Sequence, residues 1–154
     1  MSGLAESLLA ALLGAASALV PLVNAEVYAV ASAGRDSPGA ALVVVVALAV
    51  GQTAGKLVLF EAARRGSGRF TARHAPRSAR ARRWADRTKL ALRSRRTGHP
   101  LVLASAALGL PPLAVVSLAA GASGQRRWEF AVVCLVGRTA RFAALVLPAA
   151  WALG

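Results

Sequence analysis

Two arginines stand inside an apolar segment near the carboxyl end of the chain. Arg138 and Arg141 interrupt the apolar residues 128–153. Arg138 lies about ten residues into this run, or about 15 Å along a helix, and an arginine at the centre of a bilayer costs about 2.5–3.5 kcal/mol. Residues three apart share a helix face, and arginine binds phosphate through paired hydrogen bonds. The pattern predicts a site for an anionic group; the alternative is that both side chains extend to the membrane surface.

A carboxylate also lies in apolar surroundings, near the amino end. Glu26 follows Pro21 by five residues, so it lies beside a predicted helix break. A buried carboxylate there requires an opposite charge or a proton. Arg138 or Arg141 is the expected partner. The alternative is an exposed position at a loop tip.

Two more polar side chains occur in the apolar residues 40–63. Gln52 and Lys56 are four residues apart, so they share one face of a helix. Lys56 is also close enough to the helix end for its amine to reach the surface, and both alternatives stay open. The predicted substrate or ion contacts are therefore Glu26, Gln52, Lys56, Arg138 and Arg141.

Enzyme chemistry is not expected. No nucleophile lies beside a base, and His74 and His99 both fall outside the apolar segments. These histidines and the single Cys134 do not have the spacing of a metal site. We therefore predict a protein without enzymatic activity, metal or cofactor.

The composition indicates the elements that position these side chains. The chain has 154 residues, of which 56% are hydrophobic, yet its net charge is +13. Thirteen of its 19 basic residues lie between Arg64 and Arg96. A basic segment between apolar ones is expected on the cytoplasmic side of a membrane. We therefore predict a cytoplasmic loop over residues 64–99 that contacts anionic lipid head groups and not nucleic acid.

Part of this basic loop is compatible with a helix. Residues 77–93 predict a helix that lies on the membrane surface. Trp84, Leu90 and Leu92 would face the membrane.

The apolar segments predict a single all-α membrane domain over residues 1–154. Residues 40–63 and 128–153 are each long enough to cross a bilayer core of about 30 Å as a helix. Residues 4–34 and 100–124 are each broken at proline into shorter pieces, which predicts two re-entrant helical hairpins.

The second hairpin has an alternative, a single proline-kinked helix that crosses fully. A hairpin leaves Arg126 and Arg127 on the cytoplasmic side with the other arginines, so the distribution of positive charge favours it. A hairpin followed by a crossing helix then occurs twice in opposite orientations. This layout is the inverted repeat common among transporters.

Three groups of short motifs follow one another along nearly the whole chain. They are Pro21-Leu-Val-Asn-Ala-Glu26 with Ala33-Gly34, Gly51-Gln-Thr-Ala-Gly55-Lys56 with Phe60 and Ala63-Arg64-Arg65-Gly66, and Pro111-Pro112 with Ala119-Ala-Gly121, Phe130 and Gly137-Arg138-Thr-Ala-Arg141-Phe142. In this order they resemble the motifs of the DedA/VTT (SNARE-associated Golgi protein) membrane family.

The resemblance implies two re-entrant hairpins that face each other, and a role in moving lipids such as undecaprenyl phosphate or phospholipid, with proton coupling as one option. Glu26 matches the hairpin carboxylate of the family. Lys56 stands where many members carry an acidic residue, which puts proton coupling in question. The second hairpin lacks the arginines that many members carry beside its prolines. The chain therefore resembles a short, divergent member.

The leading hypothesis is a multi-pass transporter or scramblase for an anionic lipid in the bacterial inner (plasma) membrane. Membrane lipids are the expected partners, and a homo-oligomer is compatible with the sequence. One alternative is a small cation or drug exporter with Glu26 as its coupling carboxylate. The other is a membrane assembly factor that transports nothing and uses its buried charges only as structural pairs.

Overall fold

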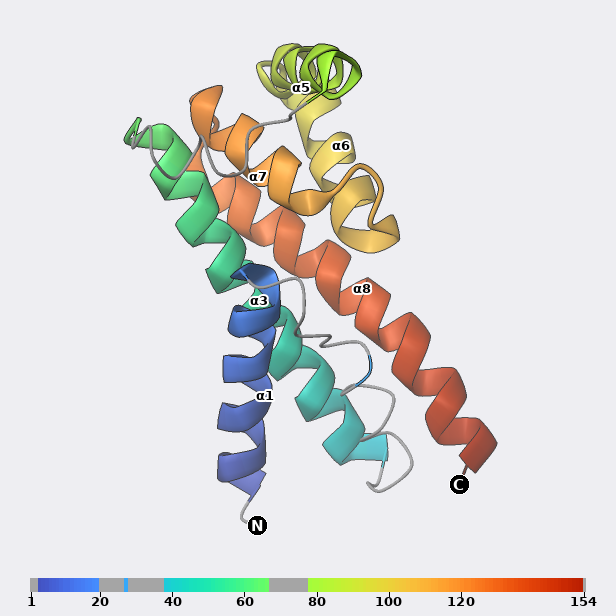
Figure 1. The fold of residues 1–154 in the computed structure, drawn as a ribbon. Coiled ribbons are helices and arrows are strands. Elements are labelled where there is room, and N and C mark those ends of the chain that lie inside the picture. Colours follow the sequence, from blue (N-terminus) through green and yellow to red (C-terminus); the bar gives the residue numbers. More distant parts are fainter. Residues whose placement is uncertain (1–2, 20–26, 28–37, 67–77, 154) are drawn as a thin grey trace. The chain divides into compact units, whose positions relative to one another are not determined.

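The computed structural model describes residues 3–19, 27, 38–66 and 78–153. All regular secondary structure in these ranges is helical, which confirms the predicted all-α class. The helices are α1 (Gly3–Leu19), α3 (Pro38–Arg64), α5 (Ala79–Leu92), α6 (Arg95–Leu108), α7 (Leu113–Ala122) and α8 (Arg127–Leu153) (Figure 1).

The two segments predicted to cross the membrane are long helices, α3 and α8, each of 27 residues. Both contain a stretch that is long and apolar enough to span a bilayer. α3 begins at Pro38, where the missing proline N–H removes no helical hydrogen bond. It ends before Gly66, whose positive φ of 66° lets its N–H bond back to the Ala63 carbonyl at 3.3 Å.

The chain divides into two compact units, residues 1–55 with 138–154, and residues 56–137. In the first unit, α1 and α3 touch backbone to backbone. A Cβ at Gly51 would overlap the Ala11 carbonyl, and a Cβ at Gly14 would lie 2.5 Å from the Leu48 carbonyl oxygen. Small residues such as Gly14 and Gly51 allow this close approach of the two backbones. The rest of the predicted 4–34 hairpin, from its break at Pro21 onward, lies outside the described residues.

The second unit has its own apolar core. The rings of Phe60 and Phe130 stack with centroids 5.0 Å apart, and both side chains are fully buried. Burying one such side chain stabilises the fold by about 1.5–3 kcal/mol. Gly121 on α7 lies against the Phe60 carbonyl, where a Cβ would overlap the oxygen. Cys134 belongs to the same core and is fully buried.

Helix α5 confirms the helix predicted over residues 77–93. It packs against both α6 and α7, so its last turn is covered by protein. Leu92 is consequently buried in the core, and the prediction that this side chain faces the membrane is wrong. Trp84 and Leu90 are exposed.

The predicted second hairpin, residues 100–124, corresponds to α6 and α7, which pack against each other (Figure 1). α6 begins earlier than expected, at Arg95, because Gly98 and Pro100 are accommodated inside it. Gly98 packs closely there, since a Cβ would lie 3.2 Å from the Leu92 backbone. The 14 residues of α6 and 10 of α7 reach about 21 and 15 Å, less than the roughly 30 Å of a bilayer core.

The turn between α6 and α7 is stabilised by hydrogen bonds within the protein. Gly109 adopts a left-handed φ of 80° and its N–H bonds to the Ser105 carbonyl. The fully buried Ser105 hydroxyl donates to the carbonyl of Pro111, which follows a cis peptide bond. The Pro112 carbonyl accepts from the N–H groups of Val115 and Val116. The turn thereby satisfies backbone groups that a bilayer would leave without water.

The hydrogen bonds of this turn predict that two buried serines contribute unequally to the free energy of unfolding. Ser105→Ala removes the donor to the Pro111 carbonyl in the turn, and it should lower the free energy of unfolding by about 1–3 kcal/mol. Ser117, equally buried, donates only to the Leu113 carbonyl one turn back in its own helix, so Ser117→Ala should change stability little. Thermal unfolding of the purified variants in detergent, followed by circular dichroism, measures both. Equal losses would show that Ser105 has no special role in the turn.

Candidate functional site

Gln52 carries an unsatisfied polar atom in the middle of α3. It is the fourteenth of the 26 residues in the candidate span Gly39–Arg64, and only 6% of its surface is exposed. Its Nε2 donates to the Ser17 hydroxyl on α1 at 2.8 Å, and that hydroxyl donates to the Gly14 carbonyl. Its Oε1 is buried and has no hydrogen-bond partner. Buried polar atoms are nearly always paired, so this one indicates a ligand or a water.

The two arginines of the predicted site lie on α8. Arg138 is the twelfth of the 22 residues in the candidate span Arg127–Pro148, so it lies at the middle of the span, as predicted. Arg141 follows one turn later, and both side chains are half-buried. Gln52 Oε1 accepts no hydrogen bond from either of them.

The structure describes Lys56 but not Glu26, the other two predicted site residues. Lys56 is buried, with 7% of its surface exposed, which favours the buried alternative over a side chain that extends to the membrane surface. Glu26 lies outside the described residues. Its pairing with Arg138 or Arg141 stays a prediction.

A buried ion pair that sequence reasoning missed joins α6 to α8. Glu129, with 6% of its surface exposed, receives Arg95 Nη2 at 2.8 Å on one carboxylate oxygen and His99 Nε2 at 3.1 Å on the other. Arg95 and His99 are four residues apart, so they share a helix face. The four-residue spacing of Arg95 and His99 is visible in the sequence. It does not predict a shared helix face when residues 64–99 are expected to form a loop.

A second carboxylate, Glu61 on α3, also contacts the beginning of α8. Its Oε1 lies 3.6 Å from Arg127 Nη1 and its Oε2 lies 3.5 Å from Arg65 Nε. These contacts are longer than the 2.8 Å contact between Arg95 and Glu129, and Glu61 is 26% exposed against 6% for Glu129, so they are the weaker pairs. The two carboxylates together anchor the beginning of α8 to α3 and α6.

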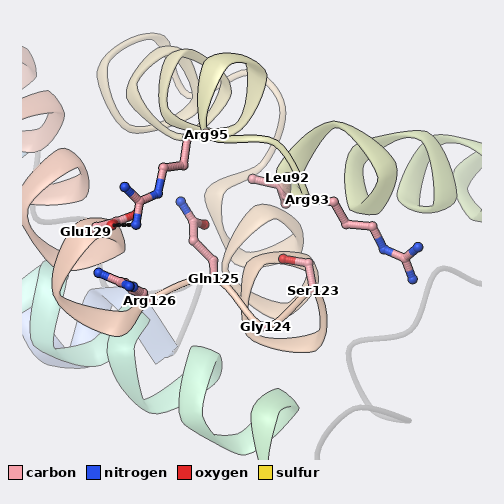
Figure 2. A pocket seen from close by; sticks show the side chains of 8 residues that line it. All are labelled: Leu92, Arg93, Arg95, Ser123, Gly124, Gln125, Arg126 and Glu129. Carbon is pink, nitrogen blue, oxygen red and sulfur yellow. Dashed lines mark ion pairs between the residues drawn. The ribbon is translucent and has the colours of Figure 1, made fainter.

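A polar cavity of about 200 Å³ lies beside Glu129. It is formed where α5 passes into α6 and where α7 passes into α8 (Figure 2). Gly124 has a φ of 78°, and the hydrogen bonds from Gly124 N–H to the Gly121 carbonyl and from Gln125 N–H to the Ala120 carbonyl close the end of α7. This turn directs Gln125 and Arg126 to the cavity.

The cavity lining is predominantly cationic. Arg93, Arg95 and Arg126 are opposed by one carboxylate, Glu129, so the lining has a formal charge of +2. Figure 2 shows the Gln125 amide between Arg95 and Ser123, whereas the guanidinium of Arg93 points away from them. The described residues include no group of three metal-ligating side chains, here or elsewhere. An anion is the ligand that this charge suits.

Comparison with protein-family models, curated proteins and solved structures gives no match. The resemblance to the DedA/VTT family accordingly stays a prediction from the motifs.

The buried position of Glu129 predicts a stronger coupling than an exposed ion pair has. In a double-mutant cycle of Arg95→Ala and Glu129→Gln, the coupling energy should be about 1 kcal/mol or more, because the carboxylate is buried. The matched cycle of Arg65→Ala and Glu61→Gln tests a pair whose arginine is 79% exposed, and it should give about 0.3–0.5 kcal/mol. Unfolding of the variants in detergent supplies both values. Similar coupling in the two cycles would contradict the structural importance of Glu129.

Proposed function

We propose that the chain is a multi-pass membrane protein that moves an anionic lipid, undecaprenyl phosphate or a phospholipid, from one leaflet to the other. One observation carries the proposal: both long apolar helices have a polar side chain at their midpoint. These are Gln52 on α3 and Arg138 on α8. Polar groups at that depth are costly in a lipid environment, and in membrane proteins they mark pathways for substrates and ions.

The surfaces of the helices support a membrane location. On α1, Leu4, Leu8 and Leu12 form one stripe and are between 65% and 80% exposed. Exposed aliphatic side chains also follow α3 and α8. Water would disfavour so much contiguous apolar surface, whereas acyl chains would cover it. The exposed side chains include Leu42, Val43, Val46, Val50, Val58, Val132 and Val136.

The charge of the midpoint residues favours an anion. Arg138 and Arg141 are three residues apart on one face of α8, and guanidinium groups bind phosphate through paired hydrogen bonds. The phosphate head group of a lipid could pass beside Arg138 and Arg141 while the acyl chains of that lipid stay in the surrounding bilayer. Glu26 would balance the arginines when no lipid is bound, and would provide a group for proton coupling.

The short helices α6 and α7 support the same proposal. A pair of helices too short to cross, joined by a turn whose polar groups are satisfied by protein, is what a re-entrant hairpin requires. The basic segment that precedes this pair would lie at the cytoplasmic face of a bacterial inner membrane.

The direct test is a lipid-movement assay. Purified protein is reconstituted into vesicles with a fluorescent phosphatidylglycerol or polyprenyl phosphate, and the fraction accessible to an external quencher is followed in time. Wild-type protein should accelerate exchange between leaflets. The double variant Arg138→Gln and Arg141→Gln should slow it by about tenfold or more, since charge-assisted hydrogen bonds contribute about 1.5–3 kcal/mol each.

The control is Arg65→Gln, which also removes positive charge but at an exposed position outside the predicted site. This variant should exchange lipid at the wild-type rate. Wild-type protein that leaves the labelled lipid in its original leaflet, or a double variant as fast as wild type, would contradict the proposal.

A further inference from the structure

The cavity beside Glu129 contains the features of a ligand site that the transport proposal does not use. Its positive charge is only partly neutralised within the protein. Glu129 already receives Arg95 and His99. Arg93 and Arg126 form no ion pair with any residue that the structure describes. Arg126 therefore contributes to this small polar cavity a positive charge that no described carboxylate neutralises, and Arg93 contributes to its rim.

A second observation also indicates a ligand. Gln125 Oε1 is buried and has no hydrogen-bond partner, although its residue lines the cavity. The amide lies between Arg95 and Ser123 (Figure 2). A buried amide oxygen without a donor costs free energy, and a ligand that carries both an anion and a hydrogen-bond donor would satisfy this oxygen together with the arginines.

The size of the cavity suits a small anionic group. A volume of about 200 Å³ is enough for a phosphate ester with a short polar substituent.

We propose that this cavity binds the head group of a membrane phospholipid that carries a hydrogen-bond donor, such as phosphatidylglycerol or phosphatidylethanolamine. Arg126 and Arg95 hold the phosphate, and Gln125 Oε1 accepts a hydrogen bond from the hydroxyl or ammonium group. The proposal rests on the membrane location proposed above, because only then does a lipid head group reach the beginning of α8. Glu129 is a positioning residue that holds Arg95 at the cavity through its 2.8 Å contact.

The test measures binding and not transport. Purified protein in detergent is titrated with short-chain phosphatidylglycerol, phosphatidylethanolamine and phosphatidylcholine, and bound lipid is counted by native mass spectrometry. The first two lipids should bind several-fold more tightly than phosphatidylcholine, whose quaternary ammonium has no donor. Arg126→Gln should weaken their binding by about tenfold. Gln125→Met, which keeps the shape but removes the acceptor, should abolish the preference over phosphatidylcholine.

The matched control is Arg96→Gln, which removes the same charge from an exposed residue outside the cavity lining and should leave binding unchanged. Equal losses in Arg126→Gln and Arg96→Gln would overturn the proposal in favour of general attraction to a basic surface. Displacement of the lipid by inorganic phosphate at similar concentration would overturn it in favour of a free-anion site. Binding without lipid movement would contradict only the transport proposal, and lipid movement without binding here would contradict only this one.

Discussion

Polar groups in apolar surroundings must find their partners inside the protein, and this constraint governs the described structure. The turn between α6 and α7 illustrates it. The Ser105 hydroxyl donates to the Pro111 carbonyl, and Gly109 takes the left-handed conformation that returns its N–H to α6. These hydrogen bonds, together with the contacts between α6 and α7, hold the two short helices together. Without such a turn, the exposed backbone would favour one continuous helix.

The same constraint explains where charges are grouped. The carboxylate of Glu129 is buried, but Arg95 and His99 contact it from a single face of α6, so the beginning of α8 is held against α6. Gln52 is the contrasting case. One end of its amide is satisfied by Ser17, whereas Oε1 is buried without a partner. Glu129 has a structural role, whereas the unpaired Oε1 of Gln52 is able to accept a hydrogen bond from a bound group.

Much of the fold follows from patterns that are visible in the sequence. Long apolar runs predict α3 and α8 to within a few residues, and Pro111-Pro112 predicts the break before α7. The beginning of α6 was not predictable from the pattern, because Gly98 and Pro100 normally end helices. Gly98 instead packs closely against the Leu92 backbone, and such tertiary contacts are not encoded in local spacing. The cavity beside Glu129 was missed for the same reason, since its lining comes from four helix ends.

The central claim is that α6 and α7 enter and leave on the same side of a membrane. Because Cys134 is the only cysteine, a Cys134→Ser background allows single cysteines at Ser78, in the basic segment, and after Gly154 to be labelled from either side of intact cells. The account predicts that an impermeant maleimide added outside labels the carboxyl-terminal cysteine but not the one at position 78. Protection of both cysteines from the outside reagent, with labelling of both after lysis, would mean that residues 100–124 cross fully, and the hairpin would be contradicted.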